Sequence, residues 1–372
     1  MALKPPSAPL LGIDASRVSA DRAGIDNYLH HLLPGLVAAW RKGGGDVVVF
    51  AADPAVASHV DPPVTVVPGG GRGWTQARLP LEVRRLGVSV YFSPIPVLPV
   101  LVPLSCPAVV TVHDLLEFRT RWWYFRRLIG RTLDQARAVI CVSQATLEEV
   151  RAEFPRGAAK AVVVREAADA VLYREAAGGE PDPVFKRLGV PGPPILAVGT
   201  LQPRKNYLRL VEAYARVASE EPALAPLVIV GGRGWEYEPI LARPQELGVA
   251  DRVIFTGHLD EPDLAALMRH AVMLAAVSTA EGFGLPLVEA MYSGIPILAS
   301  DIPPFREVAG HAATFVNPGS VDDIAAGLRR LATDAALRQQ LVEVGRGRRA
   351  LFSWDRAAGE VGEVLRATLT GV

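Results

Sequence analysis

The stretch EGFGLPLVEAMYSGIPILASD runs from Glu281 to Asp301 and predicts a glycine-rich turn, a helix and a buried strand in succession. Gly282 and Gly284 allow the backbone to pass close to a ligand without a clash at Cβ. Pro286 suits the first position of the helix, where its missing N–H costs nothing. The free N–H groups and the positive end of the helix dipole then favour a bound anion at this turn.

Two carboxylates flank this predicted anion site. Glu281 precedes the turn, and Glu289 is expected in the first turn of the helix. Because helical side chains lean towards the N-terminus, both carboxylates are expected to point into one small volume beside the backbone of Phe283 and Leu285. Such a site suits a nucleotide sugar, in which a diphosphate lies between two sugars. The alternative is an ordinary strand–loop–helix with unrelated acidic residues.

The spacing of Glu281 and Glu289 around the core G-F-G-L-P resembles the signature of glycosyltransferase family 4. The resemblance implies the GT-B fold and transfer of a hexose from a nucleotide-diphosphate sugar with retention of configuration. It also implies that Glu281 holds hydroxyl groups of the sugar and that Glu289 holds the ribose diol. The general resemblance to bacterial mannosyltransferases of surface polysaccharide synthesis favours mannose, and both GDP- and UDP-linked donors stay open.

Short apolar runs alternate with longer helical patterns throughout the 372 residues. The runs are rich in β-branched residues and do not alternate strictly, which predicts parallel strands buried on both faces. We therefore expect an α/β protein of two Rossmann-like domains, residues 1–175 and 190–352, whose sheets face each other across a cleft. The stretch from Glu175 to Pro194 is the expected linker. The family resemblance implies that the last helix, 354–372, packs back on the first domain.

Composition excludes several classes of protein. Lys plus Arg and Asp plus Glu are 39 each, so the chain lacks the basic excess of a general nucleic-acid binder. Cys106 and Cys141 are expected as buried apolar residues in a reducing compartment, and no Cys/His cluster has zinc spacing. The apolar stretch from Ser93 to Val112 contains five prolines, which favour an extended loop and a strand over a membrane span. Without a long apolar leader, we expect a cytoplasmic protein.

The segment VGTLQPRKNYLRLVEAY predicts a second part of the anion site. A strand is expected to end at Gly199, and Arg204 and Lys205 follow in a loop before a helix that starts near Asn206. Arg binds phosphate with two hydrogen bonds and Lys acts as a point charge. The resemblance implies that this pair binds the donor diphosphate, whereas two surface charges on a solvated loop are the alternative.

Two further segments have matches in the family. In VTVHDL, His113 follows a buried strand, and the resemblance implies that it contacts the donor sugar near its six-position; Asp114 is expected to orient it or to cap the next segment. After the first strand, LLGID, the resemblance implies that Gly24 lets the backbone approach the donor phosphate. Relatives carry adjacent glycines there, and this chain has Gly24 alone.

Three features carry less specific interpretations. Ser143 is expected as the N-cap of a helix, and Ser353 as that of the last helix. Gly257 and His258 match positions at which relatives shape the nucleobase pocket. The segment from Glu117 to Arg137 holds six arginines with Trp122, Trp123, Tyr124 and Phe125. It fits either a helix packed on the core or a face that touches an anionic membrane carrying a lipid-linked acceptor.

The catalytic residues expected from these motifs are His113, Arg204, Lys205 and Glu281. Protein cations would stabilise the departing diphosphate, and the chain has no Asp-x-Asp triplet, so neither a metal nor another cofactor is expected. A glycan or lipid-linked glycan is the expected acceptor. A nucleotide-sugar isomerase or epimerase on the same fold and a non-catalytic nucleotide-sugar-binding protein are the alternatives. The absence of G-x-G-x-x-G after any strand and of a P-loop argues against a dinucleotide oxidoreductase and an NTPase.

Overall fold

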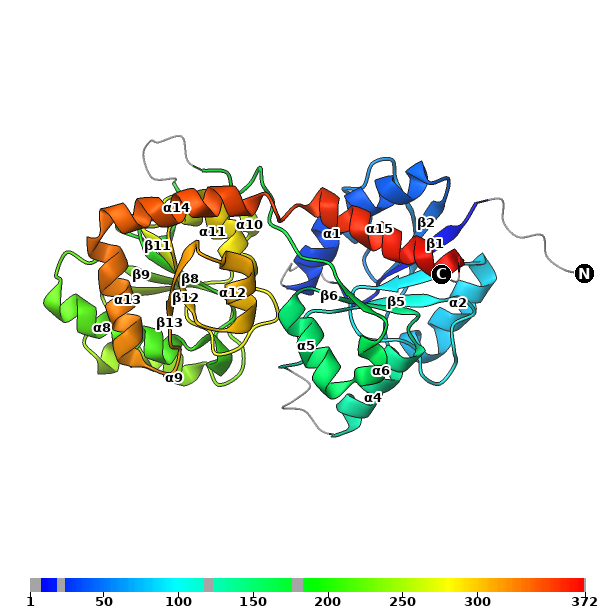
Figure 1. Cartoon of the computed structure of the whole chain (residues 1–372), viewed down its shortest axis with the longest axis horizontal. Coiled ribbons are helices and arrows are strands. Elements are labelled where there is room, and N and C mark those ends of the chain that lie inside the picture. The colour runs from blue at the N-terminus through cyan, green and yellow to red at the C-terminus, as the bar shows by residue number, and fades with distance from the viewer. Residues whose placement is uncertain (1–7, 19–23, 117–122, 176–182, 371–372) are drawn as a thin grey trace, which may run out of the picture. The chain divides into compact units, whose positions relative to one another are not determined.

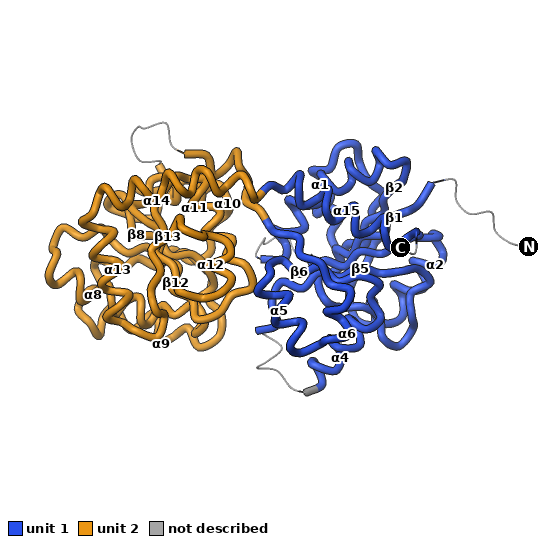
Figure 2. The backbone as a smooth tube through the Cα atoms, viewed as in Figure 1, with its two compact units in different colours: residues 1–166, 353–372 blue, residues 167–352 orange. Residues whose placement is uncertain are grey.

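The computed structural model describes residues 8–18, 24–116, 123–175 and 183–370, and it divides the chain into two compact units. Unit 1 comprises residues 1–166 and 353–372, and unit 2 comprises residues 167–352 (Figure 2). Each unit contains a parallel sheet with helices packed against it, which confirms the predicted α/β class.

Seven strands of the described residues form the sheet of unit 1, in the order β3-β2-β1-β4-β5-β6-β7, and neighbouring strands are parallel (Figure 1). The strands are β1 (Leu10–Ala15), β2 (Asp46–Ala51), β3 (Thr65–Pro68), β4 (Val90–Ser93), β5 (Ala108–Val112), β6 (Ala138–Cys141) and β7 (Ala161–Val163). Alternate residues enter two cores: Val47 and Val49 of β2 lie in one, and Val48 and Phe50 lie in the other. The central strands are therefore buried on both faces, as the β-branched runs predicted.

Helices cover both faces of this sheet. α1 (Ile25–Lys42) and α15 (Trp354–Thr370) share the core that contains Val47 and Val49. The opposite core contains residues of α2 (Leu79–Leu86), α4 (Trp123–Gln135) and α5 (Gln144–Glu153). Shorter helical segments are η1 (Pro54–Ala57), η2 (Trp74–Arg78) and α6 (Pro155–Ala158).

The last helix returns to unit 1 and lies beside the first (Figure 1). A Cβ added at Gly35 of α1 would lie 2.9 Å from the Cβ of Ala358, so the absence of a side chain at Gly35 allows α15 to approach closely. Ser353 precedes α15, and its Oγ accepts a long hydrogen bond of 3.5 Å from the backbone N–H of Arg356.

Unit 2 contains a six-stranded parallel sheet, counted over the described part of the chain, in the order β10-β9-β8-β11-β12-β13. Its strands are β8 (Ile195–Val198), β9 (Leu227–Val230), β10 (Val253–Gly257), β11 (Met273–Ala276), β12 (Ile297–Ser300) and β13 (Ala313–Val316). The order of the strands reverses between β8 and β11. In open parallel sheets, ligands bind outside the carboxyl ends of the strands, beside such a reversal point.

The helices of unit 2 pack around this sheet. They are α7 (Val184–Leu188), η3 (Pro203–Lys205), α8 (Tyr207–Glu220), α9 (Glu238–Glu246), α10 (Glu261–Arg269), α11 (Leu285–Ser293), α12 (Pro303–Ala309), α13 (Val321–Thr333) and α14 (Ala335–Arg349). Residues of α8, α9, α13 and α14 share one core with the sheet. α11 contacts β11, α10, α12 and α14.

The structure shows the conformation of two segments that are rich in proline or in glycine and proline. The proline-rich stretch after β4 is followed by β5, as predicted, and no helix within the described ranges is long and apolar enough to cross a membrane. The Gly- and Pro-rich stretch from Glu175 to Pro194 was expected as a linker, but it contains α7. Val184 and Phe185 of this helix are buried, because α7 packs against α10.

Candidate functional site

The loops after β8 and β11 meet at the reversal point of the second sheet. The backbone N–H of Thr279 donates to the carbonyl of Arg204 at 2.8 Å. Asn206 has a left-handed φ of 62° and ends η3, and its Nδ2 donates to the carbonyls of Val277 and Pro318 at 3.0 and 2.8 Å. These bonds fix the Pro-Arg-Lys turn against the loop that precedes α11.

Arg204, Lys205 and Glu281 form a compact ionic cluster at this point. Nη1 of Arg204 lies 2.5 Å from Oε2 of Glu281, and Nζ of Lys205 lies 2.6 Å from Oε1. Burial by itself would raise the pKa of Glu281, but the charges of Lys205 and then Arg204 outweigh burial and hold this pKa below its usual value. Glu281 is therefore an ionised, mostly buried carboxylate between two cations.

Gly199 makes room for the Lys205 side chain. Its φ is 140°, and an added Cβ would lie 2.6 Å from Cε and 2.9 Å from Nζ of Lys205. The hydroxyl of Tyr207 donates to the carbonyl of Gly199 at 2.9 Å and holds this backbone in place. A side chain at position 199 would push the ammonium group away from Glu281.

The N-terminus of α11 lies directly after Glu281 in the chain. Gly284 is the N-cap residue with a φ of 115°, and Phe283 is buried with its ring 5.9 Å from that of Phe352. The helix begins at Leu285, so Pro286 occupies its second position instead of the predicted first. Gly282 lies in the loop between Glu281 and the cap.

Glu289 is the fifth residue of α11, so it begins the second turn, not the first as predicted. Its side chain is buried, and Oε2 has no hydrogen-bond partner among the described residues. Burial, and to a smaller extent the charge of Glu261, raise the pKa of Glu289 to about 8, although the neighbouring Tyr173 hydroxyl and Lys205 lower it. The two glutamates of the motif thus differ: Glu281 is ionised and paired, whereas Glu289 holds its proton at neutral pH.

His113 lies in unit 1, directly after β5. Its Nδ1 is 2.7 Å from Oε1 of Glu166, and its Nε2 is 2.9 Å from the carbonyl oxygen of Pro94. Sequence reasoning missed Glu166, although it follows β7 at the same edge of the sheet. Asp114 was expected to orient His113 or to cap the next segment, and its carboxylate accepts a hydrogen bond from the backbone N–H of Leu116 at 3.0 Å, which is the capping role.

The other predicted positions have local roles in the structure. Ser143 is the N-cap of α5, since its Oγ accepts from the N–H of Thr146 at 2.9 Å, as predicted. Gly24 precedes α1 with a φ of 57°, and no atom of the described residues lies within 4 Å of where a Cβ would point. Gly257 ends β10 with a φ of 74°, and the exposed His258 follows it.

The basic and aromatic segment is described only from residue 123 onwards, so Trp122 lies outside the described residues. α4 buries Ile129 and Leu133, whereas Tyr124 and Phe125 near its start are 59% and 37% exposed. Arg126 and Arg131 are also exposed. The helix therefore packs on the core and at the same time presents a basic, aromatic face to solvent.

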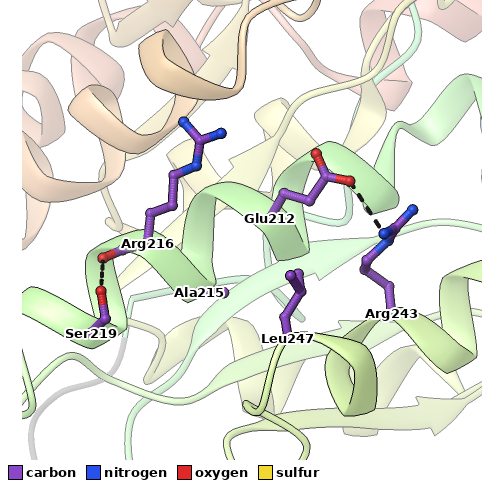
Figure 3. A pocket seen from close by; sticks show the side chains of 6 residues that line it. All are labelled: Glu212, Ala215, Arg216, Ser219, Arg243 and Leu247. Carbon is purple, nitrogen blue, oxygen red and sulfur yellow. Dashed lines mark hydrogen bonds and ion pairs between the residues drawn. The ribbon is translucent and has the colours of Figure 1, made fainter.

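One open cavity of about 380 Å³ lies away from the predicted site, between α8 and α9 (Figure 3). It is lined by Glu212, Ala215, Arg216, Ser219, Arg243 and Leu247. Nε of Arg243 is 3.6 Å from Oε1 of Glu212. None of the residues predicted for the anion site lines this cavity.

Within the described ranges, no group of three or more His, Cys, Asp or Glu side chains is arranged to hold a metal ion. Cys106 and Cys141 are free thiols, and burial raises the pKa of each to about 12. Both thiols are therefore protonated at neutral pH. Cys141 is buried, as predicted, whereas Cys106 is only half-buried.

Comparison with known proteins identifies the family. Residues 23–170 match the model of "Glycosyltransferase Family 4", and residues 185–348 match that of "Glycosyl transferases group 1". O-antigen chain mannosyltransferase B of Escherichia coli is 30% identical over 67% of this chain and 67% of the relative. The serotype-specific mannosyltransferase WbdA of the same species is 30% identical over 67% of this chain, which spans only 32% of that longer protein.

The fold has a counterpart among solved structures. The Anabaena protein HepE in complex with UDP and glucose superposes with a TM-score of 0.76 at 19% identity, covering 96% of this chain and 100% of that chain. At this identity the likeness shows the fold alone. The predicted fold class and enzyme class are both confirmed: this chain belongs to glycosyltransferase family 4, and it is a glycosyltransferase of the GT-B fold.

Proposed function

We propose that the protein transfers a hexose from a nucleotide-diphosphate sugar to a glycan or lipid-linked glycan, with retention of configuration and without a metal ion. The observation that carries this proposal is the convergence of Arg204 and Lys205 on Glu281, immediately before the N-terminus of α11. Two cations and a helix N-terminus on neighbouring loops form a setting for a diphosphate.

The reaction needs stabilisation of the leaving group. The bond between the anomeric carbon and the β-phosphate oxygen breaks, and negative charge develops on that phosphate. Arg204, Lys205 and the amides at the start of α11 supply fixed positive charge and donors for it, which is the electrostatic contribution that usually dominates. The acceptor oxygen attacks from the face that the phosphate leaves, and its proton passes to the departing phosphate oxygen.

We assign the two glutamates to the sugars of the donor. Glu281 would bind hydroxyl groups of the hexose while remaining within reach of the cations. The Oε2 atom of Glu289, which has no partner within the described part of the chain, would bind the ribose diol. His113 would donate a hydrogen bond from Nε2 to a hydroxyl of the hexose.

Mannose from GDP-mannose is the donor that we propose, because the two curated relatives described above are named as mannosyltransferases. One of them is named as an O-antigen chain mannosyltransferase, which supports a growing glycan as the acceptor. A UDP-linked hexose is the competing donor that should be compared with GDP-mannose, since HepE was solved with UDP and glucose.

We also propose that the exposed face of α4 touches an anionic membrane surface that carries the acceptor. Tyr124 and Phe125 are exposed beside Arg126 and Arg131, and such aromatic and basic side chains favour the interface of anionic lipids. Sedimentation with vesicles that contain phosphatidylglycerol should capture the wild-type protein. A Tyr124→Ala, Phe125→Ala double variant should bind less; equal binding would remove this part of the proposal.

The reaction itself is tested by mass spectrometry of products. GDP-mannose, UDP-glucose and UDP-galactose are each incubated with a mixture of glycan acceptors, with and without EDTA. The proposal expects one added hexose per product, retained anomeric configuration by NMR, and equal rates in EDTA. Nucleotide-sugar isomerisation without nucleotide release would contradict transfer, and loss of activity in EDTA would contradict metal independence.

A further inference from the structure

Both ring nitrogens of His113 face oxygen atoms that accept hydrogen bonds. Nδ1 lies 2.7 Å from the Glu166 carboxylate, and Nε2 lies 2.9 Å from the backbone carbonyl of Pro94. A neutral imidazole carries one N–H, and its second nitrogen has a lone pair. A neutral ring would therefore direct that lone pair at an oxygen of Glu166 or of Pro94, whereas the doubly protonated ring donates to both.

The surroundings of the His113 ring also favour the doubly protonated state. The side chains of His113 and Glu166 are 19% and 11% exposed, so their attraction is only partly screened by water. The edge-to-face ring of Tyr28 in α1 has its centroid 4.7 Å from that of His113, and the backbone carbonyl of His113 accepts from Oγ1 of Thr146 in α5 at 3.3 Å. These contacts fix the position of His113 from two helices.

Among the described residues, the charges that act on the ring are the carboxylates of Glu166 and Asp114. Burial would lower the pKa of His113, but the hydrogen bond and charge of Glu166, the carbonyl of Pro94 and the charge of Asp114 outweigh burial and raise this pKa above 6.5. The phenol of Tyr28 is the titratable group that α1 places beside the ring, and burial keeps its pKa far above neutrality, so it stays uncharged.

We propose that Glu166 is a positioning residue for sugar transfer: it holds His113 as a doubly protonated ring, so that Nε2 carries a donor proton at neutral pH. The use of this donor rests on the proposed function. When the sugar binds, the Nε2–H group exchanges the Pro94 carbonyl for a hydroxyl oxygen of the hexose. No proton is transferred, and the Nδ1–H bond to Glu166 is kept.

The protonation state can be measured without any substrate. Histidine ring signals of the isotope-labelled full chain are followed by NMR from about pH 5.5 to about pH 8.5, which brackets the ordinary histidine pKa. The His113 signal is assigned by its loss in His113→Gln. We expect a doubly protonated ring at neutral pH in the wild type, and a titration near or below the ordinary pKa in Glu166→Gln. Glu148→Gln, which changes an exposed carboxylate of the same unit, is the control, and His113 should titrate in it as in the wild type.

A neutral His113 ring at pH 7 in the wild type, or an unchanged titration in Glu166→Gln, would overturn the proposal. If Glu166→Gln folds poorly, Glu166→Asp replaces it, because the shorter carboxylate keeps the charge but not the 2.7 Å contact. In this variant the pKa of His113 should be raised less than in the wild type.

The pH dependence of kcat/KM tests whether the protonation of His113 matters for sugar transfer. The ratio of wild-type to Glu166→Gln kcat/KM should be close to one at the acid end of this range. It should rise with pH, to about tenfold for one lost hydrogen bond, where the wild-type ring is still doubly protonated and the Glu166→Gln ring is not. A ratio that does not change with pH would show that the protonation of His113 is irrelevant to transfer. Inactivity of the wild type with every nucleotide sugar would refute the proposed function and leave the NMR result standing.

Discussion

The Nζ atom of Lys205 lies 2.6 Å from Oε1 of Glu281, and the second oxygen of this carboxylate binds Arg204. The cations that we propose for the donor diphosphate are thus aligned by an internal anion on the loop that leads into α11. Their positions do not depend on flexible surface side chains, because Lys205 and Glu281 are only 13% and 11% exposed. Such preorganisation is what electrostatic stabilisation of a leaving group requires.

Removal of the Lys205 ammonium should slow transfer strongly. We expect Lys205→Ala to lower kcat by about 10²–10³, because one fixed donor to the developing phosphate charge is lost. Steady-state kinetics with the active nucleotide sugar measure the effect. Lys186→Ala, at an exposed lysine of the same unit, is the control and should leave kcat unchanged. A Lys205→Ala enzyme with wild-type kcat would refute the role of this cation.

Glu281→Ala should cost both activity and stability. It leaves two cations without their buried partner, which typically destabilises a protein by about 3 kcal/mol. It also removes the proposed contact with the sugar hydroxyls, so most transfer activity should disappear. Urea unfolding and product formation measure the two effects, with Glu246→Ala as the control at an exposed ion pair. Turnover equal to that of the wild type would refute the assignment of Glu281 to the sugar.

Gly199→Ala should displace the Lys205 side chain without replacing any charged residue. The new Cβ would meet Cε of Lys205 at 2.6 Å, and the φ of 140° is strained for any residue with a side chain. We expect a loss of transfer activity well beyond the loss of stability, which is on the order of 1 kcal/mol for such strain. Gly192→Ala is the matched control, because its Cβ would enter open space without positive φ. Equal activity of the two variants would contradict this reading of Gly199.

The ionisation of Glu289 should lower the free energy of unfolding as the pH rises towards 8. Its pKa of about 8 in the folded protein exceeds the ordinary value of 4.5, so between these values the folded state holds a proton that the unfolded state has released. Stability therefore falls across this window, by up to about 1.4 kcal/mol per pH unit, and levels off above pH 8. Glu289→Gln mimics the neutral carboxyl and should gain stability relative to the wild type from pH 5 to pH 8.

Urea midpoints of both proteins at several pH values test this prediction. Parallel profiles for the wild type and Glu289→Gln would mean that Glu289 is ionised in the folded protein. Glu246→Gln, at an exposed glutamate on α9, should give the wild-type profile.

The sequence predicted most of the fold because the signals are local. Buried parallel strands such as Leu227–Val230 read as continuous apolar runs, and the capping Ser143 lies three residues from the N–H that it binds. The motif around Gly284 likewise predicted a turn that enters a helix, although the helix begins one residue earlier than Pro286 suggested.

The sequence could not predict contacts made by residues that are distant in the chain. Glu166 and His113 are 53 positions apart, and their contact depends on where β5 and β7 end. Glu281 and Glu289 were expected to point into one small volume, but the pKa of Glu289 depends on burial and on Glu261, neither of which a motif encodes. The helix α7 was hidden in a stretch of Gly and Pro because only five residues form it.

The most direct test of the account is a crystal structure of the protein with a bound nucleoside diphosphate. We predict that the β-phosphate lies within hydrogen-bonding distance of Arg204 Nη1 or Nη2, of Lys205 Nζ and of the backbone amides between Gly282 and Leu285. A diphosphate bound elsewhere in unit 2, for example beside Arg216 and Arg243 in the cavity between α8 and α9, would contradict it.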